Sequence, residues 1–138
     1  MTVNICTQAR NGAGDYIVDL IDVGAAVSSG YIEIRDGAKP ASPQAPATGN
    51  LLSKLILSYP AFRAFASGQA FSNAITDDTN VAKSGVASWF RIYSKGQTAV
   101  MDGDVTETGG GGDIEFDNVH FVKGGTVSIT SLLAVMPQ

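Results

Sequence analysis

The sequence contains very little cysteine or histidine. Cys6 and His120 are the only residues of their kinds in 138 positions. A single cysteine excludes an intramolecular disulfide and every zinc site that needs several thiolates. A single histidine excludes the two-histidine motifs of metalloproteases. Stability therefore has to come from a hydrophobic core, and at this length about two-thirds of the unfolded surface can be buried.

Charged residues are also scarce, at 16% of the chain with a net charge of −4. The nine lysines and arginines form no run, whereas nucleic-acid binding requires a cationic face. No apolar run approaches the ~18 residues of a membrane-spanning helix, and the first residues lack the regions of a signal peptide. We therefore expect no nucleic-acid partner, no membrane association, and production in a cytoplasm.

What the chain does contain is glycine (16 residues) among many small polar residues, which predicts short strands joined by turns. One helix is predicted over residues 8–23, after an N-terminal arm of residues 1–7. Thr7 is its expected N-cap and Gly24 follows its end. Apolar residues at three- and four-residue spacing predict its buried face: Ala9, Ala13, Ile17, Leu20 and Ile21.

A proline-rich segment covers residues 38–50, with Pro40, Pro43 and Pro46 at three-residue spacing. This spacing favours an extended path without ladder hydrogen bonds. Two interpretations remain open: a ligand for SH3- or WW-type domains, or a long crossover loop between two sheets. We favour the loop because the segment is embedded in a compact domain.

The rest of the chain alternates between apolar and polar residues with a period of two. Strands are predicted over residues 31–35, 51–59, 70–75, 85–93, 98–106, 113–121 and 126–136. The strand over 51–59 has apolar residues on both faces and is expected to be central. Residues 1–138 are thus predicted to form a mainly β single domain, a β-sandwich or jelly roll with about seven or eight short antiparallel strands and one N-terminal helix.

Several residue groups have the right types for chemistry but not the right spacing. Cys6 and His120 are the only possible cysteine–histidine dyad, and Asp113, Glu115 and Asp117 share one side of a strand, as the carboxylates of a glycosidase could. Asp77-Asp78 and Asp102-Gly103-Asp104 lack the spacing of a complete calcium loop. Gly109–Gly112 lacks the following helix and the lysine of a phosphate-binding loop. Turn formation and strand polarity explain them equally well. We therefore expect no catalytic residue, no metal and no cofactor.

Trp89, Arg91 and Tyr93 are the strongest candidate site. They share one face of the strand over 85–93, and tryptophan, tyrosine and arginine are the types most enriched at interface hot spots. Either this face contacts another protein, or a helix or sheet of the same subunit covers it. Together with the three prolines, these residues form the predicted protein interface.

A family resemblance covers nearly the whole chain. Seven segments carry it: Ile32–Pro40, Ala47–Leu52, Ser58–Phe62, Ser72–Thr76, Gly85–Ile92, Met101–Val105 and Gly124–Thr130. In these segments the chain resembles a family of small proteins encoded among the virion structural genes of tailed bacteriophages, some of them regarded as head-associated. The resemblance implies a virion role and supplies no catalytic residues.

The expected function is therefore non-enzymatic: a capsid decoration (cement) protein on the virion surface. Its expected partners are the major capsid protein or other virion proteins, with self-association into a homo-oligomer. The alternative is a tail, neck or fibre component, including a glycan-binding β-sandwich in which Trp89 and Tyr93 would stack on sugars.

Overall fold

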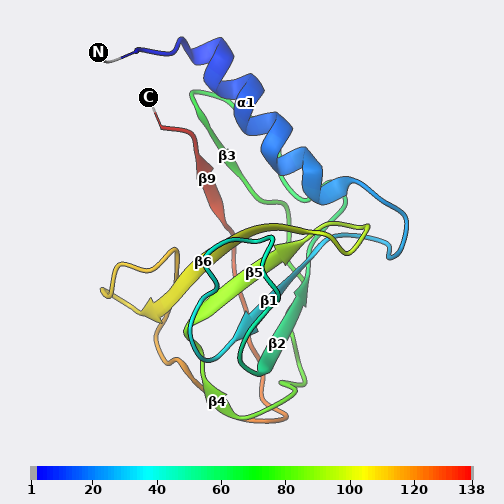
Figure 1. The fold of residues 1–138 in the computed structure, drawn as a ribbon, viewed down its shortest axis with the longest axis vertical. Coiled ribbons are helices and arrows are strands. Elements are labelled where there is room, and N and C mark those ends of the chain that lie inside the picture. Colours follow the sequence, from blue (N-terminus) through cyan, green and yellow to red (C-terminus); the bar gives the residue numbers. More distant parts are fainter. Residues whose placement is uncertain (1–2, 138) are drawn as a thin grey trace.

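The computed structural model describes residues 3–137, and these are mainly β with one N-terminal helix and one curled sheet (Figure 1). The first two residues of the predicted arm lie outside the described residues. The elements are α1 (Thr7–Asp19), the 3-10 turn η1 (Leu20–Asp22), β1 (Tyr31–Arg35), β2 (Leu51–Ile56), β3 (Gln69–Phe71), β4 (Gly85–Val86), β5 (Trp89–Tyr93), β6 (Ala99–Glu107), β7 (Ile114–Phe116), β8 (His120–Phe121) and β9 (Leu133–Val135).

The predicted helix is confirmed by α1 and η1, although Cys6 rather than Thr7 is the N-cap. Of its predicted buried residues Ile21 is buried, but the rest of the predicted face is wrong. Gly14 and Val18 are buried, whereas Ile17 and Leu20 remain more than a third exposed. Three hydrogen bonds explain the rotation, since they all leave the side that carries Gly14: Arg10 Nη2 donates to Met136 O, Gly68 N donates to Asn11 Oδ1, and Phe65 N donates to Asp15 Oδ1, at 2.9, 2.8 and 2.7 Å.

The main sheet has the strand order β2-β1-β5-β6-β7. The expectation that residues 51–59 form a central strand is wrong, because β2 ends at Ile56 and lies at the edge. Residues 76–82 run along that edge and pair with its free backbone groups. Ala82 N donates to Leu52 O at 2.8 Å, and Thr76 N donates to Ile56 O at 2.9 Å.

The predicted strand over 85–93 divides into β4 and β5. Ala87 and Ser88 form the break. Ala87 N donates to Val119 O, directly before β8, the partner of β4, and Ser88 N donates to Arg35 O at the end of β1. The predicted strand over 113–121 likewise divides into β7 and β8, at the place where the alternation slips. Of residues 126–136, only β9 is a strand.

The expectation of purely antiparallel strands is wrong at one pair. β7 runs parallel to β6, with Val105 opposite Ile114. The glycine segment makes this possible, because Gly109 and Gly111 adopt φ values of +89° and +84° and let the chain reverse within a few residues. Residues 108–113 therefore form a tight return loop.

The core lies on one face of the main sheet, where Ile32, Ile34, Phe90 and Ile92 are buried. Residues 57–86 and 117–136 cover this face, and the strands within them pair only as the two-stranded ribbons β3–β9 and β4–β8. No continuous second sheet forms in the described chain, so the mainly β class is confirmed while the sandwich is not. The opposite face carries Trp89 and Arg91, and another part of the chain covers it.

Candidate interaction surface

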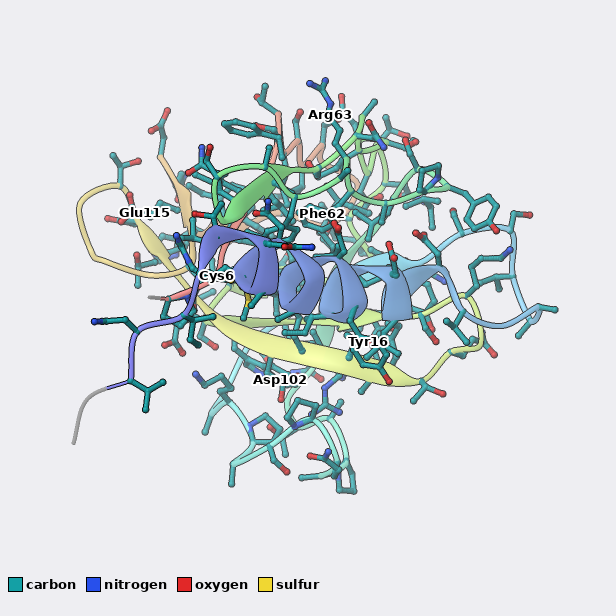
Figure 2. The ribbon with its side chains drawn as sticks, turned by 90° about the horizontal axis from the view of Figure 1, so that it is seen from above. Cys6, Tyr16, Phe62, Arg63, Asp102 and Glu115 are labelled. Atoms are coloured by element: carbon teal, nitrogen blue, oxygen red, sulfur yellow. The ribbon has the colours of Figure 1, made fainter. Side chains whose placement is uncertain are left out.

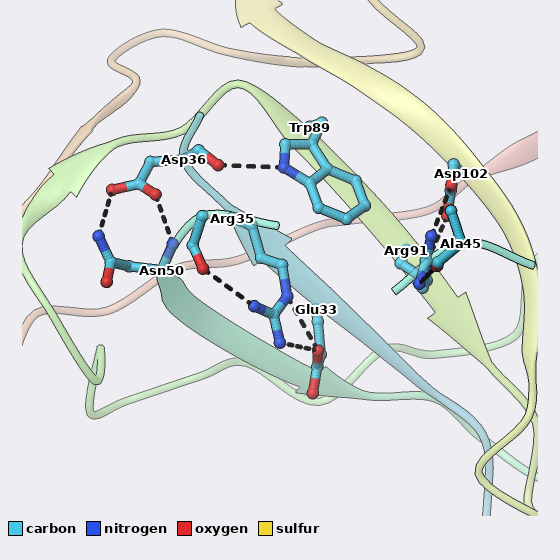
Figure 3. Close-up of polar contacts among 9 residues, drawn as sticks. Glu33, Arg35, Asp36, Ala45, Asn50, Trp89, Arg91 and Asp102 are labelled. Carbon is cyan, nitrogen blue, oxygen red and sulfur yellow. Dashed lines mark hydrogen bonds and ion pairs between the residues drawn. The ribbon is translucent and has the colours of Figure 1, made fainter. Parts of the chain in front are cut away.

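The proline loop, residues 36–50, covers the sheet face that carries Trp89. Trp89 is fully buried, and its Nε1 donates a 3.0 Å hydrogen bond to Asp36 O (Figure 3). The guanidinium of Arg91 lies 5.4 Å from the indole ring centre, within the range of a cation–π contact. The expectation that this face is exposed as an interface is therefore wrong: the same subunit covers Trp89 and Arg91.

Arg91 fixes the middle of the proline loop. It forms a two-point ion pair with Asp102 of β6, Nε to Oδ1 at 2.6 Å and Nη2 to Oδ2 at 3.0 Å. The same guanidinium donates to Ala45 O at 2.8 Å and Ser42 O at 3.3 Å. The hydrogen bond with Asp102 raises the pKa of Arg91, so the group stays charged although it is only 3% exposed. A buried charge needs all these partners to offset its desolvation.

The two ends of the proline loop are joined by a clasp between Asp36 and Asn50. The Asp36 carboxylate accepts hydrogen bonds from both the backbone and the side-chain nitrogen of Asn50, and these bonds lower the pKa of Asp36. Gly49 sits inside the clasp with φ +74°, where a Cβ would lie 2.0 Å from Asp36 O. Ser88 Oγ and Thr48 Oγ1 add bonds to loop carbonyls. The loop is thus held at both ends and in its middle.

The prolines divide between the inner and outer sides of the loop. Pro40 and Pro43 are half-buried, whereas Pro46 is exposed. The loop joins β1 and β2, which are neighbours in one sheet, so the expected crossover between two sheets is wrong. An SH3- or WW-type domain that bound this segment would meet a loop whose carbonyls at residues 42 and 45 already accept hydrogen bonds from Arg91.

Tyr93 lies next to Arg91 on the same strand face, at the edge of this arrangement. Its ring stacks on Tyr31 with the centres 5.0 Å apart, and Lys54 Nζ lies 4.1 Å above the Tyr31 ring. Burial raises the pKa of Tyr31. The structure therefore brings Trp89 and Arg91 together under the loop and places Tyr93 in a separate aromatic stack. Because Trp89 is buried, stacking on a sugar through this residue is excluded in this conformation.

The other groups considered in the sequence are engaged in local contacts. Asp104 pairs with Lys39 at 3.1 Å, and Asp113, Glu115 and Asp117 accept hydrogen bonds from residues 104, 111 and 108, which close the glycine loop. Cys6 lies at the start of α1, whereas His120 lies on β8 beside β4, at the other end of the molecule (Figure 1). Within residues 3–137, no group of three or more histidine, cysteine or acidic side chains could hold a metal.

The sequence prediction missed the apolar residues that are exposed. On α1 these are Tyr16, at 69% exposure, with Ile17 and Leu20; Figure 2 shows Tyr16 on the side of the helix opposite to Phe62. On the ribbon β3–β9 they are Phe71, Leu133 and Val135, at 46%, 49% and 57%. The sequence shows the three- and four-residue spacing of the apolar residues in this helix, but whether they are exposed depends on which face of the helix packs against the rest of the protein.

No protein-family model, curated protein or solved structure matches this chain. None of the helices in the described part of the chain is long and apolar enough to cross a membrane.

Proposed function

We propose that this chain is a non-enzymatic virion structural protein of a tailed bacteriophage: a capsid decoration protein that binds the major capsid protein on the head surface. One observation carries the choice of contact surface. The proline loop is fixed to the sheet by the buried Trp89 and Arg91, so its outer side is formed before any partner arrives. A pre-ordered loop loses little conformational entropy on binding, which favours association.

The outer side of the proline loop has the composition of a contact surface. Its exposed side chains are small or uncharged except for one lysine, which pairs with Asp104: Lys39, Ala41, Gln44, Pro46 and Thr48. Short side chains and prolines have few rotamers to lose when they are buried. The location on a virion comes from the resemblance to phage structural proteins, and the homo-oligomeric state follows from the self-association that such a virion part needs. In the same proposal, the ribbons β3–β9 and β4–β8 act as the second layer of a β-sandwich.

An add-back experiment tests this function. Virions are prepared from a phage in which the gene is deleted, and purified protein is added to their heads and tails separately. Sedimentation followed by quantitative mass spectrometry measures the bound protein. We expect saturable binding to heads. Binding to tails instead would make the protein a tail, neck or fibre component, and binding to neither would overturn the proposal.

A pair of variants tests the contact surface. Pro46→Glu places a charge on the outer side of the proline loop, whereas Val122→Glu places one at an exposed apolar position after β8. We expect Pro46→Glu to weaken binding to heads by about tenfold or more, as for a central interface residue. Val122→Glu should bind like wild type. The reverse result would move the contact surface away from the loop.

A further inference from the structure

The strand β9 is paired along one edge only. Its partner is β3, with Ala134 opposite Ala70. Ser72 N donates to Leu132 O and Met136 N donates to Gly68 O, so the even-numbered residues direct their backbone groups toward β3. By the alternation of antiparallel pairs, the N–H and C=O groups of Leu133 and Val135 point to the other side. Within residues 3–137 they have no backbone partner.

This open edge lacks the usual protection against pairing. Natural edge strands carry charges, inward lysines or bulges that prevent the addition of another strand. Residues 131–136 contain no charged side chain, and Leu133 and Val135 are about half exposed. A mostly apolar cavity of about 240 Å³ borders β9, between it and the main sheet. Its lining includes Phe62, Met101, Ile114 and Leu133, together with the acidic residues Asp102 and Asp113. An added strand would pair with the edge and cover this cavity.

The chain also contains a segment with the matching properties. Val3–Cys6 is uncharged, and Val3 and Ile5 alternate with Asn4 and Cys6 and are 66% and 49% exposed. The segment leaves the body in an extended path (Figure 2), and Cys6 has β-region angles of φ −67° and ψ 158°. β-branched residues at every second position are typical of strands. At about 3.3 Å per residue its four residues span about 13 Å, enough to cover the three-residue edge of about 10 Å.

The segment and the edge lie at the same end of the molecule. Arg10, in the first turn of α1, donates a 2.9 Å hydrogen bond to Met136 O directly after β9. Figure 1 shows both chain ends on this side. Val3–Cys6 forms no backbone hydrogen bond with its own β9 in the described chain, so its strand partner is placed in a neighbouring molecule. A two-fold axis at this end allows each copy to give its segment to the other, which closes the assembly at two subunits.

We infer that two copies of this chain associate by exchanging their N-terminal segments, with Val3–Cys6 of each copy added as a strand to the open edge of β9 in the other. This inference goes beyond the proposed function and does not rest on it, since it concerns the purified protein alone. The partner of the edge is thus a second copy.

Sedimentation equilibrium of the purified chain tests the association. We expect a concentration-dependent monomer–dimer equilibrium, with Ile5→Lys weakening it by about tenfold or more because a charge enters an apolar contact. Ile5 lies before α1 and is 49% exposed, so a lysine there reaches solvent and this variant keeps the fold. Val122→Lys, a matched exposed valine at the other end, should dimerise like wild type. A wild-type chain that stays monomeric, or an Ile5→Lys variant that dimerises normally, would overturn the inference.

Oxidative cross-linking tests where the segment lies. Wild-type chain, whose single cysteine is Cys6, is mixed with a variant carrying Cys6→Ser and Val135→Cys. A disulfide requires Cα atoms within about 7 Å, so an inter-chain bond forms only if the segment lies along the partner's β9. We expect this bond with Val135→Cys and not with Val122→Cys in the same background. Equal cross-linking of both variants, or of neither, would contradict the exchange.

Discussion

Arg91→Met should destabilise the protein strongly, because Arg91 joins the proline loop to the sheet. The substitution keeps an unbranched side chain but removes the charge, leaving the Asp102 carboxylate, only 6% exposed, without its cation. It also releases the carbonyls of Ala45 and Ser42. Removing one partner of a buried ion pair costs about 3–5 kcal/mol. For a domain of this size that corresponds to a decrease in Tm of roughly 10–15 °C.

Calorimetry and limited proteolysis measure the two consequences separately. The Tm reports the lost ion pair, and the rate of subtilisin cleavage within residues 38–50 reports the release of the loop. The matched control is Lys39→Met, which breaks the ion pair with Asp104 on the same sheet; both side chains there are more than a third exposed, so the cost should stay below about 1 kcal/mol. A decrease in Tm of similar size in both variants would refute the reasoning, as would an Arg91→Met loop that resists cleavage like wild type.

Three further predictions concern the helix, the core and acid stability. Gly14→Ala should lower the free energy of unfolding by about 1–3 kcal/mol, because its Cβ would lie 2.3 Å from the Phe65 ring. Gly12→Ala, whose Cβ would have nothing within 4 Å, should raise it by up to about 1 kcal/mol. Chemical denaturation measures both, and a stabilising Gly14→Ala would contradict the docking of α1. The single tryptophan is fully buried, so iodide should quench its fluorescence only after unfolding, and quenching of the native protein would show that the proline loop opens. Hydrogen bonds from Asn50 lower the pKa of Asp36 in the folded state. The stability that this carboxylate contributes is therefore present above its unfolded pKa of about 3.9 and is lost as the pH falls through the folded pKa. Asp36→Asn should lose less stability than wild type on acidification, and equal losses would refute the clasp.

The local alternation of apolar and polar residues predicted the strands that pair with other strands in the main sheet. The alternation in residues 31–35 matches β1 closely, and the slip near Asp117 marks the division between β7 and β8. These features depend on side-chain period, which the sequence displays directly. The helix was predicted for the same reason, within a residue or two of its bounds.

The burial of the candidate site could not be predicted in the same way. Trp89 is covered by residues that lie about 50 positions earlier in the chain, and no local pattern indicates that the proline loop folds back over β5. The docked face of α1 was mispredicted because the apolar spacing indicated the face with Ala13 and Ile17, whereas the helix docks through Gly14, which provides the space for the Phe65 ring. In both cases a contact between distant segments decided the outcome.

Cryo-electron microscopy of virions tests the central claim most directly. Heads with and without this protein are reconstructed and their difference density is compared. The account predicts density on the outer surface of the head, with residues 36–50 against the major capsid protein and Trp89 buried beneath them. Unchanged heads, or density confined to the tail or neck, would contradict the assignment as a decoration protein.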